Sequence, residues 1–545
     1  MKKYSILSLL VIISCSDPEK IVKQHLQNSE KLMGIEFTDA ERDSILPGLI
    51  DLREQYKDPR KLELPNHVTF PLYFLPRSPG LEIPTGNDQY QFQEIVTDPP
   101  DDIEDCAFMT VGQLAHLIRT RTVTSEELTI MYLDRLKRFG SELECVISVT
   151  KELALERSRR ADQEIKSGNY RGPLHGIPYG AKDLLAVPGY RTTWGATPYQ
   201  NQVIDKAATI IQKLDEAGAV LIAKLSLGAL AWGDVWFDGK TRNPWDLEQG
   251  SSGSSAGPGS ATAAGLVAFS IGSETWGSIV SPSTRNGVTG LRPTFGTVTR
   301  GPGAMTLSWT MDKLGPMCRS VADCALIYSI IRGSDNIDRS VMDVPFQVPK
   351  PKQIENLRVA YIGSAFEDTA TTENDKEVLD ILGSLGIKLI PIELPEFPTN
   401  ALSFLLSVEA AAAFDELTRT NQDDELVRQM RMAWPNVFRK SRYIPAVEYI
   451  QANRARVLLN EKMNELFGSI DVYVVPSFWG DNLLRTNLSG HPCVVLPNGF
   501  NKNDSPTSIS FIADLYNDGN AIAIAQLYQE ATSWHKRYPP KYAVE

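Results

Sequence analysis

Histidine is scarce in this sequence, which contains only six among 545 residues. The stretch "GSETWGSIVSPS", residues 272–283, holds a candidate nucleophile, Ser278, but no histidine that could accept its proton. A serine nucleophile needs a neighbouring base, so the base must be sought among other side chains. The six histidines are His25, His67, His116, His175, His491 and His535.

Cysteine is equally sparse, and its spacing fits none of the common metal or disulfide patterns. Apart from Cys15, the cysteines form an odd, scattered set without a Cys-x-x-Cys pair. Such a set indicates neither a zinc site nor a disulfide framework. It predicts single buried thiols, with one disulfide left open as an alternative. The five residues are Cys106, Cys145, Cys318, Cys324 and Cys493.

The sequence also lacks an excess of positive charge, since its formal net charge is −12. Nucleic-acid binding needs clustered lysine and arginine, so nucleic acid is not an expected partner. Long apolar stretches are missing too. The run from Tyr4 to Ile13 is too short to cross a bilayer as a helix, and no later stretch is typical of a transmembrane helix.

The first fifteen residues, "MKKYSILSLLVIISC", combine two lysines, an apolar run and a cysteine. They resemble a bacterial lipoprotein export signal. The resemblance implies that residues 1–14 are removed, that Cys15 is lipidated, and that the protein is exported and held in the cell envelope by its lipid. An ordinary secretory signal or a buried apolar start are the alternatives.

Two regions follow this signal. Residues 15–104 form an arm: 16–60 are charged and predict helices, and the proline-dense 64–89 predicts an extended segment. Residues 105–545 form the main domain. Within it, Thr110 with Gln113 and Thr124 with Glu127 fit capping boxes that open two helices.

Short apolar strands alternate with helices along the main domain. This alternation predicts an α/β layer fold, and the continuous apolar character of the strands indicates a sheet covered on both faces. One helix followed by a strand is expected over 207–224, and another such pair over 260–272, with the strand at 266–271. Further strands are expected at 357–363, 386–392, 471–476, 492–497 and 508–513.

A serine- and glycine-rich stretch, "EQGSSGSSAGPGSATAAG", occupies residues 248–265. Structured flanks argue against a flexible linker. A phosphate-binding loop is excluded because no Gly-Lys-Ser/Thr ends the stretch and no strand precedes it. Gly253–Gly257 satisfies Gly-x-Ser-x-Gly, but a nucleophile elbow needs a buried strand directly before it, which is missing here. The remaining interpretation is close backbone packing around a reacting group.

Lys182 ends the short apolar segment 176–181. A lysine buried there would lose proton affinity, because desolvation disfavours the ammonium, and a neutral lysine is a base. The alternative is a surface lysine paired with Asp183.

Five blocks in this order resemble the amidase signature family of serine hydrolases: "HGIPYGAKDL" (175–184), "TRNPWD" (241–246), the stretch 253–282, "TGLRPTFGTVTRGPG" (289–303) and "DKLGPMCRSVADCA" (312–325). The resemblance implies a single large domain with a central mixed β-sheet covered by helices on both faces. It also implies an amidase that acts without a cofactor or metal on small-molecule or peptide amides. Lys182 takes the place of the family's catalytic lysine, Ser254 that of a bridging serine after a cis peptide bond, and Ser278 that of the nucleophile that forms the acyl-enzyme. The backbone N–H groups of Thr275, Trp276 and Gly277, with Ser278 itself, would form the oxyanion hole.

The nucleophile block departs from the family's common Asp-Thr-Gly-Gly-Ser-Ile-Arg form. Trp276 replaces a glycine and Val280 an arginine, and the resulting form resembles the branch that includes bacterial peptide amidases. Trp276 is expected either to shape the acyl pocket or to pack in the core. His175 and His491 are expected to be structural. Two rival functions stay open: the A-type subunit of a tRNA-dependent amidotransferase, and a catalytically silent binding lipoprotein.

Overall fold

The computed structural model describes residues 21–55, 57, 59–62, 66, 68 and 72–544. Cys15 and the predicted export signal lie outside the described residues. The chain divides into two compact units, one comprising 1–65 with 443–445 and the other 66–442 with 446–545. In the small unit, α1 and α2 pack on each other, and Arg42 pairs with the buried Glu30 at 2.7 Å. Helices are thus present where the charged 16–60 stretch predicts them.

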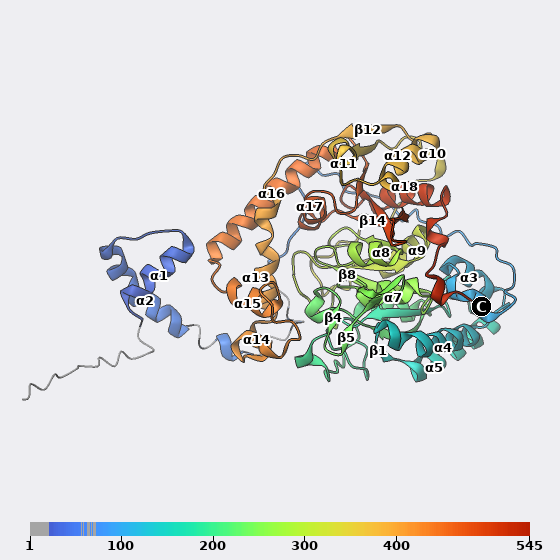
Figure 1. Ribbon diagram of the computed structural model, residues 1–545, viewed down its shortest axis with the longest axis horizontal. Helices are drawn as coiled ribbons and strands as arrows, with labels where there is room; N and C mark the ends of the chain where they lie inside the picture. Colours follow the sequence, from blue (N-terminus) through green and yellow to red (C-terminus); the bar gives the residue numbers. More distant parts are fainter. Residues whose placement is uncertain are drawn as a thin grey trace, which may run out of the picture. The chain divides into compact units, whose positions relative to one another are not determined.

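A mixed sheet of eleven strands forms the centre of the large unit, among the residues that the structure describes (Figure 1). Its order is β1-β3-β2-β8-β10-β9-β14-β15-β13-β11-β12. Strand β2 runs parallel to both of its neighbours, whereas β8, β10, β9, β14, β15 and β13 pair antiparallel in succession. The strands are β1 (Val146–Val149), β2 (Pro178–Lys182), β3 (Val220–Leu225), β8 (Phe269–Glu274), β9 (Thr289–Arg292), β10 (Lys313–Cys318), β11 (Val359–Ile362), β12 (Leu389–Ile392), β13 (Val472–Pro476), β14 (Cys493–Phe500) and β15 (Pro506–Ala513).

Every residue of β2, β3, β8, β9, β10 and β13 is buried, which confirms the prediction of a sheet covered on both faces. Such strands carry apolar residues continuously because neither face meets water. The edge strand β12 differs, since Ile390 is 38% exposed. The apolar sequence of β12 therefore does not mean that the whole strand is buried.

Helices pack against both faces of the sheet. Helices α4, α5 and α7 contact the β1–β3 side, and α8, α9, α12 and α18 contact the strands from β10 to β15. The capping boxes of Thr110 and Thr124 open α3 and α4 as predicted. The α-helices are α1 (Lys23–Met33), α2 (Asp39–Gln55), α3 (Val111–Arg119), α4 (Ser125–Leu143), α5 (Lys151–Lys166), α6 (Thr209–Glu216), α7 (Ala256–Ala263), α8 (Val280–Asn286), α9 (Val321–Ile331), α10 (Pro351–Ile354), α11 (Gly363–Glu367), α12 (Glu373–Ser384), α13 (Phe404–Ala413), α14 (Asp415–Arg419), α15 (Trp434–Ser441), α16 (Ala446–Phe467), α17 (Asn482–Ser489) and α18 (Asp518–Glu530).

The serine- and glycine-rich stretch leads into the sheet centre. A small hairpin of β6 (Arg242–Asn243) and β7 (Asp246–Gly250) runs into it, and a second hairpin lies at β4 (Val235–Trp236) and β5 (Gly239–Lys240); α7 follows. The expectation that no strand precedes the stretch is therefore wrong, but β7 is mostly not buried, so the buried strand of a nucleophile elbow is indeed missing. Strand β8 begins three residues later than the sequence predicts, because a turn after α7 uses Gly265 at φ +66° before the chain enters the sheet. Figure 1 places α7, α8 and β8 together near the middle of the large unit.

The five cysteines beyond Cys15 are free and buried, which confirms the prediction of single core thiols. Residues 72–102 form neither helix nor strand, in agreement with an extended segment after the first helices. None of the helices in the described part of the chain has the length and apolar character that a membrane crossing requires.

Candidate active site

Lys182 is the last residue of β2, and it is completely buried. Its amine Nζ lies 2.8 Å from Ser254 Oγ, 3.0 Å from Ser255 Oγ and 2.9 Å from Ser273 Oγ. The carbonyl oxygen of Ser273 lies 3.4 Å away. The amine is therefore surrounded by neutral oxygen atoms of three serines.

Burial holds the pKa of Lys182 well below its ordinary range, although the negative charges of Asp312 and Glu274 act in the opposite direction. A buried ammonium loses its hydration, and hydroxyl groups replace only part of it. Hydroxyl oxygen can either accept a hydrogen bond from the amine or donate one to its lone pair. The surroundings of Lys182 thus accommodate a neutral amine.

The local sequence left open a pairing of Lys182 with Asp183, and that alternative is wrong. The carboxylate of Asp183 instead lies 2.6 Å from the amine of Lys224 on β3. Asp183 also accepts hydrogen bonds from the N–H and hydroxyl of Thr193. Both members of this ion pair are fully buried.

Ser254 belongs to the turn that precedes α7, and the peptide bond between Gly253 and Ser254 is cis, as the family resemblance implies. Gly253 is required there by a close approach: a Cβ atom would lie 1.9 Å from the carbonyl oxygen of Gly233. Ser255 adds a further tie, because its hydroxyl bonds to the backbone of Ser273 on β8.

Ser278 lies in the turn between β8 and α8, and 8% of its surface is exposed. Its carbonyl oxygen accepts a hydrogen bond from the Ser255 N–H at 3.1 Å, so the two serine segments lie side by side. Gly277 just before it adopts φ +87°, a left-handed conformation that favours glycine. The turn thus brings Ser278 next to the segment that holds Ser254.

Three backbone amides in this turn, those of Trp276, Gly277 and Ser278, donate no hydrogen bond to any acceptor in the described part of the chain. Gly277 and Ser278 are buried, whereas Trp276 is 43% exposed. Buried amides are nearly always paired, so this group of amides is available to a bound ligand. Trp276 does not pack in the core, which removes one of its two expected roles.

Glu274, the last residue of β8, fixes this turn through hydrogen bonds of its side chain. Its buried carboxylate accepts hydrogen bonds from the N–H groups of Ile279 and Val280, and it pairs with Arg292 at 2.9 Å and with Asn487 at 2.7 Å. Burial alone would raise the pKa of Glu274, but Arg292 and these donors lower it to about 2. The carboxylate therefore stays charged and fixes both ends of the turn.

The two buried histidines lie elsewhere, in agreement with structural roles. His175 contacts Glu164 at 3.1 Å, and burial lowers its pKa. His491 bonds to Ser489 and stacks on Phe467, and burial lowers its pKa to about 3. Neither imidazole is a partner of the Lys182 amine.

The structure thus joins Lys182 to Ser254 directly and places Ser278 and the oxyanion candidates in the adjacent turn. Four further residues that complete the site were not predicted from the sequence: Ser255, Ser273, Glu274 and Asp312. Ser273 and Glu274 could have been noticed as polar residues on an otherwise apolar strand. Asp312 opens a signature block, but nothing in the sequence pairs it with Thr275, which is 37 residues away in the chain.

Comparison with known proteins assigns this chain to a class of enzymes. The family model described as Amidase matches residues 127–483. The chain therefore belongs to the amidase family, and it is an enzyme of that family. This agrees with the signature blocks that the sequence carries around the three candidate residues.

Individual relatives differ in their named activity. The chain is 27% identical to the A-type subunit of the Glutamyl-tRNA(Gln) amidotransferase of Prochlorococcus marinus over 484 residues, 79% of this chain and 99% of that protein. The native peptide amidase of Stenotrophomonas maltophilia superposes with a TM-score of 0.71 at 26% identity, covering 81% of this chain and 99% of the other. A bacterial aryl acylamidase shares the fold, with a TM-score of 0.69 at 18% identity over 79% of this chain and 98% of the other.

Proposed function

We propose that this protein hydrolyses a carboxylic amide through Lys182, Ser254 and Ser278. The observation that carries the proposal is the buried Lys182 amine, 2.8 Å from Ser254 Oγ and in contact with neutral serine groups. A buried lysine can serve as such a base, because burial lowers its pKa well below the ordinary range of lysine.

The reaction begins when Ser278 Oγ attacks the carbonyl carbon of the amide. The proton of Ser278 passes to Ser254, while the hydroxyl proton of Ser254 passes to Lys182. The backbone amides of Trp276, Gly277 and Ser278, with Thr275, receive the oxyanion. Each preorganised donor of this type lowers the barrier by about 3–4 kcal/mol.

Collapse of the tetrahedral intermediate breaks the C–N bond. The leaving nitrogen takes back the proton that Lys182 holds, through Ser254, and departs as the free amine. The acyl group stays on Ser278 as an ester. Water then attacks this ester, with the same relay accepting its proton, and releases the carboxylic acid.

We infer peptide or amino-acid amides as the substrate class. The similarity to peptide amidase over most of both chains supports this class. So does the Glu-Thr-x-Gly-Ser-Ile-Val form of residues 274–280. The half-exposed Trp276, two residues before Ser278 in the same turn, adds an apolar wall suited to a bulky acyl side chain.

A fluorophosphonate probe tests the nucleophile. We expect one phosphonyl adduct, located on Ser278 by peptide mass spectrometry, and none in Ser278→Ala. A screen of amidated peptides and simple amides would then give the substrate class. A folded protein that neither reacts with the probe nor cleaves any amide would support the silent binding protein instead.

The amidotransferase role remains the second candidate, because relatives that carry that name match nearly their whole length. That role requires partner proteins and a charged tRNA. Purification of the tagged protein from its own cells separates the two: a stable complex that amidates tRNA-bound glutamate would favour the amidotransferase. Activity of the isolated chain on free amides favours the hydrolase.

We also propose export and lipid anchoring at Cys15 in the cell envelope. The support is the sequence of residues 1–15. Labelling cells with an alkyne-tagged fatty acid should mark the protein, and Cys15→Ser should abolish the label. A labelled Cys15→Ser variant, or an unlabelled wild type, would contradict the anchor.

A further inference from the structure

The segment Thr306–Asp312 lies directly beside the candidate oxyanion turn. One carboxylate makes the connection: Asp312 accepts a hydrogen bond from the hydroxyl of Thr275 at 2.5 Å. Its other oxygen accepts the backbone N–H groups of Leu307 and Ser308, at 2.7 and 3.0 Å. The placement of Thr275 therefore depends on where this segment sits.

The N-terminal arm holds the beginning of the segment. The side-chain amide of Asn66 donates to the carbonyl of Thr306 at 2.7 Å, and the N–H of Thr306 donates to the Asn66 carbonyl oxygen at 2.6 Å. This reciprocal pair imitates a β-bridge and fixes both the distance and the orientation of the Thr306 peptide groups. The next residue, Leu307, already bonds to Asp312.

The helical side of the large unit holds the end of the segment. Glu409 on α13 is buried and accepts hydrogen bonds from the Ser308 hydroxyl and from the N–H and hydroxyl of Thr310. Tyr449 on α16 donates to the same carboxylate at 2.9 Å. A charged acceptor with four donors makes a stiff anchor.

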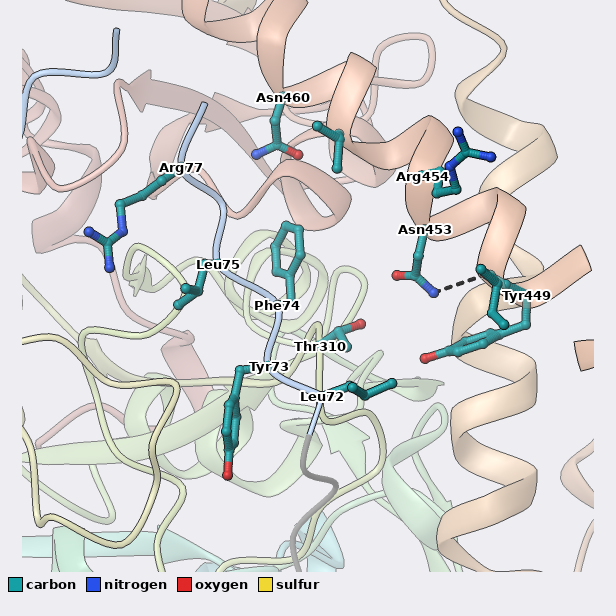
Figure 2. Close-up of a pocket in the computed structure, with 12 residues that line it drawn as sticks. Leu72, Tyr73, Phe74, Leu75, Arg77, Thr310, Tyr449, Asn453, Arg454 and Asn460 are labelled. Carbon is teal, nitrogen blue, oxygen red and sulfur yellow. Dashed lines mark hydrogen bonds between the residues drawn. The ribbon is translucent and has the colours of Figure 1, made fainter. Parts of the chain in front are cut away.

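The arm also contacts this second anchor. Arg456 on α16 donates to the hydroxyl and carbonyl oxygens of Thr310, and its guanidinium lies 3.4 Å from the centre of the Phe74 ring. Asn460 donates to the carbonyl of Pro76 at 3.1 Å. In Figure 2 the arm runs past Thr310, and α16 lies alongside with Asn453 and Asn460; a pocket of about 410 Å³ lies between them.

We propose that the N-terminal arm is a positioning element of the active site. Asn66 and Phe74 hold the Thr306–Asp312 segment, and Asp312 passes this placement on to Thr275 and the backbone donors that follow it. The inference rests on the proposed function, because it assumes that these donors act on the reacting carbonyl. The arm lies before residue 127, where the match to the family model begins.

The first test measures fluorophosphonate labelling of Ser278 as a function of probe concentration. Asn66→Ala should lower the maximal labelling rate about tenfold while leaving the half-saturating probe concentration within about twofold, because a small misplacement of the donors costs rate rather than binding. Asn87→Ala is the matched control: Asn87 is exposed on the same arm, and it accepts a hydrogen bond through its backbone carbonyl, which the substitution keeps. An unchanged rate in Asn66→Ala would overturn the proposal.

The second test is a double-mutant cycle. Thr275→Val removes the hydroxyl that donates a hydrogen bond to Asp312. Thr275→Ser keeps a hydroxyl there and should keep the wild-type labelling rate. If the arm acts through Asp312 and Thr275, then adding Asn66→Ala to Thr275→Val should slow labelling no further, because coupled residues are not additive. If the two substitutions slow labelling independently, so that their effects multiply, then the arm does not act through Asp312 and Thr275.

Phe74→Leu serves as the second arm variant if Asn66→Ala should prove unstable, since it removes the ring over Arg456 but keeps an apolar side chain. Thermal melting checks that each variant is folded. The proposed function fails separately, if wild-type protein does not react at Ser278. The arm proposal alone fails if Ser278 reacts and folded Asn66→Ala, or Phe74→Leu in its place, reacts at the wild-type rate.

Discussion

Two buried lysines on neighbouring strands have opposite surroundings. Lys182 on β2 and Lys224 on β3 are both fully buried, and Lys224 is registered opposite Ala181, one residue before Lys182. The Lys224 amine has a carboxylate at 2.6 Å, from Asp183. The Lys182 amine has three serine hydroxyls at 2.8 to 3.0 Å and, among the described residues, no carboxylate as a hydrogen-bond partner.

The two lysines differ in their partners rather than in their burial. Burial lowers the pKa of both lysines, but the charge of Asp183 opposes the effect at Lys224. A charged pair can remain charged inside a protein when its geometry is good, whereas an ammonium among hydroxyls lacks that compensation. This difference supports the proposed role of Lys182 in proton transfer, whereas Lys224 has the partner of a buried ion pair.

Removing the amine of Lys182 has the largest expected effect. Lys182→Ala should lower kcat by about 10⁴-fold or more, because the members of such a relay act as a unit. The circular-dichroism melting curve should still show a folded protein. Near-normal turnover in a folded Lys182→Ala protein would remove the relay.

Giving Lys182 a carboxylate of its own should make it resemble Lys224. Ser273→Asp should raise the pKa of Lys182 and lower kcat about 100-fold at neutral pH, since an adjacent opposite charge favours the ammonium. Raising the pH should restore activity, because the amine is active only above its pKa. Ser273→Ala removes a hydroxyl without adding charge and should not shift the pH profile upward; a shift of equal size there would contradict the electrostatic explanation.

Removing the carboxylate from the other pair should damage stability rather than catalysis. Asp183→Asn leaves the Lys224 ammonium unpaired in the core and should reduce the free energy of unfolding by about 3–5 kcal/mol. Denaturant unfolding measures the loss. The kcat of the remaining folded enzyme should change little, and a large loss of kcat without loss of stability would assign Lys224 to the reaction.

Of the four substitutions, Trp276→Gly should change the kinetics least, and it should not alter the difference between Lys182 and Lys224. Trp276 is 43% exposed and does not contact the Lys182 amine, so the pH profile should not move. We expect KM for amides with bulky acyl groups to rise by up to about tenfold, because one lost apolar contact surface discriminates weakly. A displaced pH midpoint would mean that Trp276 controls the dielectric around Lys182.

The sequence predicted the alternation of helices and buried strands well, because burial on two faces leaves a continuous apolar pattern in each strand. It also led to Lys182, Ser254 and Ser278 through the signature blocks. It could not decide between a buried Lys182 and one paired with Asp183. Asp183 lies in the turn that follows β2, and its carboxylate meets a lysine 41 residues further along the chain, a contact that no local pattern indicates.

Contacts between residues far apart in the chain could not be predicted either, because no local pattern indicates them. Asn66 lies in the proline-dense arm, and no local pattern indicates that its amide pairs with Thr306, 240 residues away. Asp312 could be recognised only as part of a signature block, without its partner Thr275. The turn that delays β8 also depends on such context, since Gly265 lies so close to Phe108 that a Cβ atom there would come within 2.9 Å of the ring.

The most direct test compares the two amines in one experiment. Nitrogen-15 NMR of lysine side chains, with Lys182→Met and Lys224→Met to assign the signals, reports the charge of each Nζ as the pH is varied. The account predicts that Lys182 is a neutral amine at neutral pH while Lys224 is an ammonium. If Lys182 instead stays charged up to the ordinary lysine pKa of about 10.4, it cannot be the base, and the proposed relay is wrong.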